Sequence, residues 1–240
     1  MFLHCLRPFA LAVVLGIGSF LGVVQFTPLP VDAAQALPGC RYDDAMTQHS
    51  STGDWQITML DTIYRISKTY IPSGLAPTSK AGLNAGAYVR NFVIPDLTAM
   101  ARAARTAGAG LRVVSAYRSY GYQNQVYQRL VERYGESAAR LSAARPGHSE
   151  HQLGTTIDFG SVRGARDAWH YTDWATTTAG SWMKSNAWKF GFMMSYPKGL
   201  RSVTCYRYEP WHYRYVGRRL ASKIHDSGLT LRQYLWDHFG

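Results

Sequence analysis

Hydrophobic positions recur at helical spacing in several stretches of the chain. The run LTAMARAARTAG after Asp96 places apolar residues three or four positions apart and ends at Gly108, which predicts a capped helix of about three turns. The same kind of pattern predicts helices over 120–134 and 179–189, and a short helix between the first of these and Arg145.

Other stretches are rich in β-branched and aromatic residues, which is typical of strands. These stretches are residues 111–117, 153–159, 192–197 and 203–216. A turn is expected at residues 146–147, before the second of them. In the last one, Glu209 and His212 cannot share a face by simple alternation, so Pro210 is expected to bend the strand. We therefore expect an α+β fold with a central, mainly antiparallel sheet flanked by helices.

The first 36 residues have the pattern of an export signal. Arg7 precedes an uncharged apolar run over 9–26, and small residues allow cleavage after Ala33 or Ala36. The alternative is a retained membrane anchor, because the run approaches the length of a spanning helix. Either interpretation places the rest of the chain outside the cytoplasm.

The remaining chain is expected to form one catalytic domain with an N-terminal extension. Residues 37–91 contain many glycines and prolines, which indicates an arm that packs on the core, with a helix near Trp55–Ile66. Residues 92–240 are then the catalytic domain. A hydrophobic content of 46% and a charged content of 17% are typical of globular proteins and exclude extensive disorder.

The formal net charge is +11, and the basic residues are scattered without a dense run. Such a charge attracts polyanions, which indicates attraction to an anionic cell envelope. The chain lacks a basic stripe and any DNA-reading motif, so no specific nucleic-acid partner is expected. The sequence does not indicate the oligomeric state.

Cysteine usage agrees with an oxidising compartment. Cys5 lies in the leader, so the mature chain keeps only Cys40 and Cys205. We predict that these two form a disulfide, and two free thiols are the alternative. The bridge would hold the N-terminal arm beside the segment that leads into Glu209.

Two blocks carry the residue types of a catalytic zinc site. PGHSEHQLGTTIDFG at 146–160 contains His151 and Asp158, and YEPWHYRYVG at 208–217 contains Glu209 and His212. Two imidazoles and one carboxylate suit Zn²⁺, and three protein ligands leave one position open for water. A glutamate that is not a ligand can then act as general base. The HExxH signature is absent, so a thermolysin-like site is excluded.

These blocks resemble the VanY-type D-alanyl-D-alanine carboxypeptidases, which belong to a wider group of zinc peptidases with the lysostaphin-like enzymes and the hedgehog signalling domain. The carried-over pattern is S-x-H-x(6)-D followed by E-x-x-H. The resemblance implies a fold like that of these peptidases and a Zn²⁺ ion held by His151, Asp158 and His212, with Glu209 as the catalytic base. It extends from about Leu111 to the C-terminus.

The segment SAYRSYGYQ at 115–123 resembles the substrate side of the same family. It implies a catalytic role for Arg118, which polarises the scissile carbonyl or holds a substrate carboxylate, and substrate binding by Gln123 or Gln125 and by Ser149. His148 also has ligand-like spacing to the second histidine of the block, although the resemblance does not assign it to the metal.

Glu150, inside the first block, is expected either to orient a ligand or to lie on the surface. The function implied by the resemblance is a zinc-dependent D-alanyl-D-alanine carboxypeptidase that acts on peptidoglycan stem peptides. Three alternatives remain open: an L,D-carboxypeptidase, an endopeptidase on peptidoglycan, and a wall-binding protein that contains zinc without catalysis.

Overall fold

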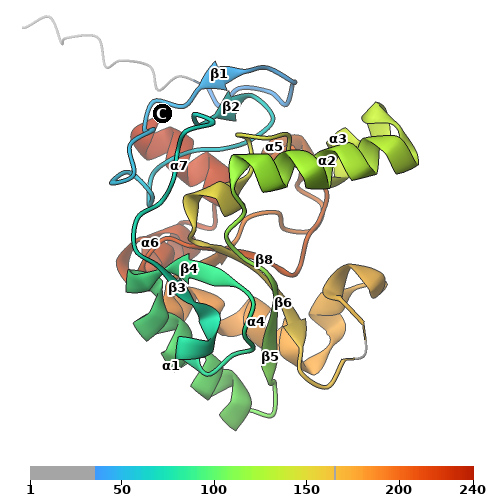
Figure 1. The fold of residues 1–240 in the computed structure, drawn as a ribbon. Helices are drawn as coiled ribbons and strands as arrows, with labels where there is room; N and C mark the ends of the chain where they lie inside the picture. The colour runs from blue at the N-terminus through green and yellow to red at the C-terminus, as the bar shows by residue number, and fades with distance from the viewer. Residues whose placement is uncertain (1–35, 165) are drawn as a thin grey trace, which may run out of the picture. The chain divides into compact units, whose positions relative to one another are not determined.

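A four-stranded antiparallel sheet forms the centre of the fold in the computed structural model, which describes residues 36–164 and 166–240 (Figure 1). The strand order is β5 (Leu111–Ser115), β6 (Thr156–Ser161), β8 (His212–Tyr215), β7 (Phe192–Met194). Each neighbouring pair is antiparallel, and Asp158 pairs directly with His212 across β6 and β8. The predicted α+β class with a mainly antiparallel sheet is confirmed.

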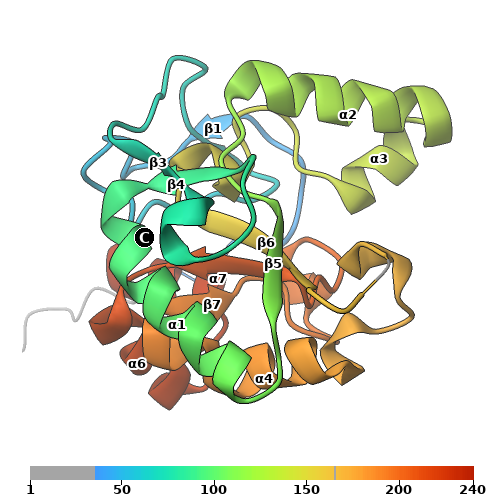
Figure 2. The ribbon, with the colours of Figure 1, turned by 60° about the horizontal axis from the view of Figure 1, so that its bottom comes forward.

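Helices α1 (Ile94–Thr106) and α4 (Thr178–Asn186) pack against this sheet (Figure 2). The main core lies between these two helices and the sheet. It includes Leu97, Met100, Val113, Ile157, Phe159, Met183 and Phe192. Each such side chain contributes about 1.5–3 kcal/mol when fully buried. Helix α1 starts two residues before Asp96, because Pro95 is tolerated in the first turn; the carboxylate lies within that turn and does not cap the helix.

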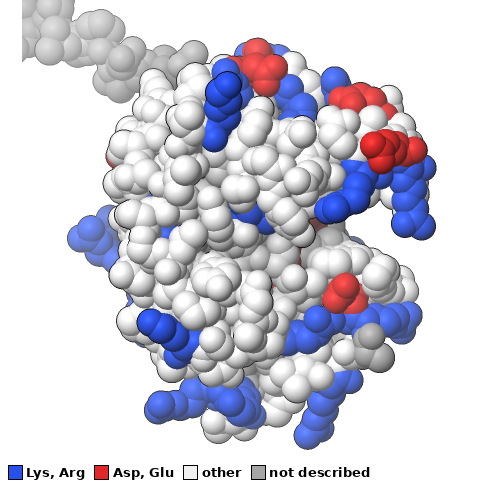
Figure 3. Space-filling view, viewed as in Figure 1, with Lys and Arg blue, Asp and Glu red and all other residues white. Residues whose placement is uncertain are grey.

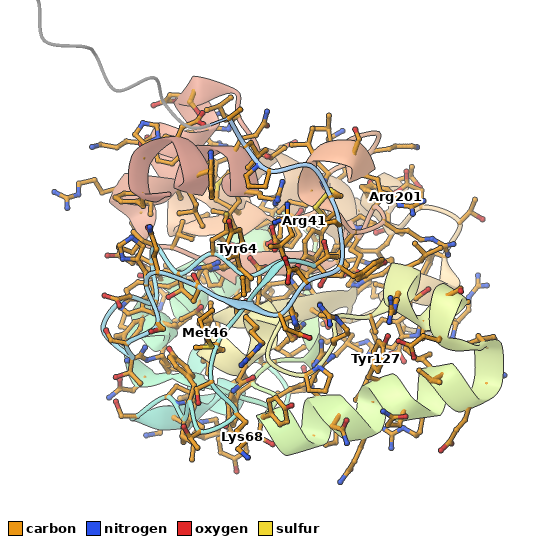
Figure 4. All side chains as sticks on the ribbon, turned by 90° about the horizontal axis from the view of Figure 1, so that it is seen from above. Arg41, Met46, Tyr64, Lys68, Tyr127 and Arg201 are labelled. Atoms are coloured by element: carbon orange, nitrogen blue, oxygen red, sulfur yellow. A yellow bond between two sulfur atoms is a disulfide. The ribbon has the colours of Figure 1, made fainter. Side chains whose placement is uncertain are left out.

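Helices α2 (Tyr120–Tyr134) and α3 (Glu136–Ser142) form a pair that stands apart from α1 and α4 in both views (Figures 1 and 2). Ser119 caps α2 by accepting the Tyr122 amide at 3.2 Å, and Gly135 ends it at φ 79°. Tyr127 lies between the two helices and donates its hydroxyl to Glu136 at 2.9 Å (Figure 4). The helix over 120–134 and the short helix after it are confirmed.

The prediction of a helix over Trp55–Ile66 is wrong, because this segment forms turns around the buried carboxylate of Asp61. Asp61 accepts the amides of Ile63 and Tyr64 at 2.7 and 2.8 Å, which competes with helical hydrogen bonds. The segment ends in β2 (Tyr64–Arg65), which pairs in parallel with β1 (Ala45–Met46).

A small antiparallel hairpin follows, formed by β3 (Leu75–Pro77) and β4 (Tyr88–Arg90). The 3₁₀ helices of the described residues are η1 (Thr78–Ala81), η2 (Asn91–Val93), η3 (Glu150–Leu153), η4 (Ala168–His170), η5 (Trp174–Thr176) and η6 (Ala187–Phe190). The predicted helix over 179–189 therefore corresponds to α4 followed by η6.

The strand predicted over 203–216 is correct only in its second half. Residues Arg201–Thr204 form the short helix α5. Cys205 then adopts a left-handed conformation at φ 69°, which is incompatible with a β-strand. The turn at Glu209–His212, in which the His212 amide donates to the Glu209 carbonyl at 3.1 Å, provides the bend expected at Pro210. β8 then leads into α6 (Arg218–Ser227) and α7 (Leu231–Phe239).

The first described residues lie against the C-terminal helices. Cys40 and Cys205 form the predicted disulfide. Tyr64 packs its ring on Trp236 at 6.1 Å, and Figure 4 shows it near Arg41 beside these helices. All but the last residue of the predicted leader lies outside the described residues. Within 36–164 and 166–240, no helix combines the length and the apolar character needed to cross a bilayer.

Candidate metal centre

His151 enters the site on η3, directly after the turn at residues 146–147. Ser149 caps η3 by accepting the His151 amide at 3.3 Å. The ring Nδ1 donates to the carbonyl of Ala116 at 2.6 Å, which fixes the orientation of the imidazole. Its Nε2 is buried and has no hydrogen-bond partner among the described residues. This nitrogen is therefore free to bind a metal ion.

Asp158 and His212 face His151 from adjacent strands. Their direct pairing across β6 and β8 places both side chains on one face of the sheet. His212 Nδ1 lies 3.1 Å from Asp158 Oδ1, and His151 Nε2 lies 3.1 Å from Asp158 Oδ2. Neither close approach has the geometry of a hydrogen bond, because Asp158 Oδ1 and His151 Nε2 remain unpartnered among the described residues.

These three residues fit a tetrahedral zinc ion. One ligand atom from each lies within 4.8 Å of the others, and all three side chains are buried. Zinc bonds of about 2.0–2.1 Å imply ligand-to-ligand separations of about 3.3 Å in a tetrahedron. Each histidine nitrogen lies 3.1 Å from one oxygen of Asp158, which is close to that value. The unpartnered buried atoms are explained by a shared cation.

The electrostatics of the cluster favour such a cation. Burial, with a contribution from Arg118, lowers the pKa of His151 to about 4, so this imidazole is neutral. Burial alone would lower the pKa of His212, but Asp158 and Glu150 raise it to about 10. The same negative charge that holds a proton on His212 stabilises a metal ion in its place.

Glu150 is buried behind His212 and orients it. Its carboxylate accepts hydrogen bonds from His212 Nε2 at 2.9 Å, Ser195 Oγ at 2.6 Å and Arg214 Nη1 at 3.1 Å. Burial would raise the pKa of Glu150, yet His212 and Arg214 lower it to about 2. The bond to Nε2 leaves Nδ1 for the metal, so Glu150 orients a ligand and is not a surface group.

Arg214 and Ser195 were not singled out from the sequence. A signal for the arginine exists, because residues two apart on a strand share a face, and Arg214 follows His212 at that spacing. No comparable signal marks Ser195, which reaches the site from the end of β7.

Glu209 lies beside the cluster without being part of it. Its Oε2 is 3.5 Å from His212 Nδ1. Burial raises the pKa of Glu209 to about 7, with Asp158 adding to the effect and His212 opposing it. A carboxylate whose pKa lies near neutrality can both accept and return a proton.

Arg118 lies next to Asp158 at the cluster. Its Nη1 donates to Ser115 Oγ at 2.9 Å and lies 3.5 Å from Asp158 Oδ2. Its Nε is buried without a partner among the described residues. The guanidinium thus brings fixed positive charge to the edge of the metal centre.

A cleft of about 580 Å³ opens onto these groups. Figure 3 shows the hollow between the α2–α3 pair and the segment around η4 and η5, with Lys and Arg side chains on both rims. Gln123 and Ser149 line the cleft. The amide of Gln123 donates to the Ala144 carbonyl at 2.8 Å, and its Oε1 has no partner in the described part of the chain. Gln125 is exposed on α2 and lies outside the cleft lining.

His148 is excluded as a ligand by its position. Its Nδ1 lies 2.8 Å from the Asp61 carbonyl and its Nε2 lies 3.0 Å from Asp44 Oδ1. Both ring nitrogens are therefore used to join the N-terminal segment to the turn before His151.

A family model described as VanY: D-alanyl-D-alanine carboxypeptidase matches residues 86–218. A D-alanyl-D-alanine carboxypeptidase of Enterococcus faecalis is 36% identical over 152 residues, which cover 60% of this chain and 54% of that protein. The chain spans about half the length of the curated relatives it matches first.

This chain matches a larger share of two solved structures. The LdcB LD-carboxypeptidase superposes with a TM-score of 0.67 at 32% identity, over 79% of this chain and 93% of that chain. A variant of the vancomycin resistance D,D-pentapeptidase VanY, solved with Zn(II), superposes with a TM-score of 0.64 at 29% identity, over 75% of this chain and 99% of that chain.

Proposed function

Because the chain belongs to the VanY family of D-alanyl-D-alanine carboxypeptidases, we propose that it is a zinc peptidase that removes the terminal D-alanine from peptidoglycan stem peptides. The observation that carries this proposal is the buried triad of His151, Asp158 and His212, with Glu209 placed 3.5 Å from one ligand atom. Three ligands, an adjacent carboxylate and an open cleft are the parts that amide hydrolysis requires.

Zinc bound by this triad supplies Lewis acidity and lowers the pKa of a water molecule to about 7. Glu209 accepts the proton of the attacking water and delivers it to the nitrogen of the departing D-alanine. Arg118 stabilises the negative charge that develops on the carbonyl oxygen. Glu150 keeps His212 in the tautomer that leaves Nδ1 free.

Ser149 and Gln123 are the residues that we propose to bind the peptide. Both line the cleft beside the metal centre, and Gln123 Oε1 has no partner among the described residues. An unpaired buried oxygen is costly, so a substrate N–H that donates to it gains affinity. Gln125 is not proposed as a substrate ligand, because it lies outside the cleft.

L,D-carboxypeptidase activity on a stem that ends in a single D-alanine is the second candidate. The similarity to the LdcB LD-carboxypeptidase favours it, since that structure covers 79% of this chain. The metal centre serves both reactions, and the difference lies in the residue before the scissile bond.

The proposed site of action is outside the cytoplasm, at the cell wall. The disulfide between Cys40 and Cys205 supports this location, because such bonds persist in oxidising compartments. The net charge of +11 supports attraction to an anionic envelope.

The test is hydrolysis of synthetic stem peptides that end in D-Ala-D-Ala or in a single D-Ala, followed by mass spectrometry. We expect release of one D-alanine, loss of activity with a chelator, and recovery with Zn²⁺. Glu209→Gln should lower kcat by about 10²–10⁴ while zinc remains bound. Zinc-loaded protein that hydrolyses neither peptide would refute the carboxypeptidase proposal.

A further inference from the structure

The cleft carries two positive charges that the proposed reaction does not use. Arg129 on α2 and Arg207 in the segment before Glu209 both line the cleft, and both side chains are exposed. Within the described part of the chain, neither makes an ion pair, a side-chain hydrogen bond or a ring contact. Their guanidinium groups are therefore available to a ligand.

Two basic residues on neighbouring segments have acidic partners. Arg140 pairs with Glu136 at 2.8 Å, and Lys198 pairs with Asp173 at 3.2 Å. The contrast distinguishes the two cleft arginines from these neighbours.

The acidic residues of the cleft lining are all used by the site itself. Glu150 pairs with Arg214 at 3.1 Å, whereas Asp158 and Glu209 belong to the metal centre. Beyond the metal centre, the lining therefore contains positive charge without a balancing carboxylate. Such a surface attracts an anionic group of the substrate and repels a cationic one.

We propose that Arg129 and Arg207 bind a carboxylate of the stem peptide other than its C-terminal one. This inference rests on the proposed function. The guanidinium plane matches a carboxylate in a bidentate geometry. A cleft of 580 Å³ has the size of sites that hold drug-sized ligands, so it has room for residues before the terminal dipeptide. Preferred stems then carry a side-chain carboxylate on the third residue, or a free α-carboxylate on the γ-linked second residue.

Four pentapeptides that end in D-Ala-D-Ala distinguish these two sources. The third residue is diaminopimelate or lysine, and the second is D-isoglutamate or D-isoglutamine. Dissociation constants are measured by calorimetry with zinc-loaded Glu209→Gln protein. The values of kcat and KM are measured with zinc-loaded protein that retains Glu209.

Arg129→Gln and Arg207→Gln should each raise the Kd of the preferred carboxylate peptide by about threefold to tenfold. Affinity for the peptide without that carboxylate should change by less than about twofold, and kcat should be retained. Arg133→Gln on the same helix and Arg201→Gln on α5 are matched controls, because both are exposed and outside the cleft lining.

Equal affinity of the unsubstituted cleft for all four peptides would overturn the inference, as would equal weakening of carboxylate and amide peptides by the arginine variants. Selective binding without hydrolysis of any peptide would support the inference and count against the carboxypeptidase reaction. Hydrolysis of all four with equal kcat/KM would sink the inference and leave the carboxypeptidase reaction standing.

Discussion

The substitution Glu150→Gln tests whether the carboxylate behind His212 supports the metal centre. Glutamine keeps the shape of the side chain but removes the negative charge that Arg214 and His212 contact. Arg214 is fully buried, so it would be left without its charged partner. We expect both the free energy of unfolding and the affinity for zinc to fall.

The structure gives the magnitude of the first effect. Glu150 has a pKa of about 2 in the folded protein, against 4.5 for the ordinary side chain. Each pKa unit corresponds to about 1.4 kcal/mol, so the charged form stabilises the fold by about 3 kcal/mol. Because the folded pKa is lowered, this stability is fully present above pH 4.5 and is lost as the pH falls toward 2. The loss of a residue that orients a ligand lowers metal affinity by about 10- to 100-fold.

Urea unfolding in the presence of a chelator measures the first effect, and zinc titration calorimetry measures the second. Glu136→Gln is the control, since it removes an exposed carboxylate paired with Arg140 and should have no resolvable effect. The difference between the unsubstituted protein and Glu150→Gln should shrink below pH 4.5. Equal unfolding free energies at pH 7, together with equal zinc affinities, would refute this reasoning.

Two further predictions concern the metal and the disulfide. Asp158→Asn should abolish stoichiometric zinc binding, measured by elemental analysis after dialysis, because an amide is a poor replacement for the anionic ligand; retention of one zinc per chain would contradict the assignment. Replacement of Cys40 and Cys205 by serine should lower the free energy of unfolding by about 2–5 kcal/mol in urea. Zinc stoichiometry should be unchanged in that double variant, and an unaltered unfolding midpoint would show that the bridge does not stabilise the fold.

The sequence predicted those elements whose ends are set locally. Helix α2 has the predicted bounds, because Ser119 caps its start and Gly135 ends it. The segment around Asp61 could not be predicted in the same way. Its apolar residues are buried by distant parts of the chain, and Arg232 binds the Asp61 carboxylate at 2.6 Å from 171 residues away.

The expected ligand set came from two short blocks and their resemblance to the VanY-type pattern, and the structure brings His151, Asp158 and His212 together. The function of Glu150 required the structure, because its partner Ser195 follows β7 and its partner Arg214 lies on β8. The exposure of Gln125 likewise follows from how α2 is rotated against its neighbours.

The direct pairing of Asp158 with His212 makes the metal ion a reporter of strand alignment. A slip of one residue between β6 and β8 would turn one of the two side chains to the opposite face of the sheet. A chain with shifted strands therefore cannot assemble the ligand set. Zinc uptake consequently distinguishes correctly aligned molecules from compact misfolded ones. Engineered insertions should therefore avoid Thr156–Asp158 and His212–Arg214, the paired residues that set this alignment.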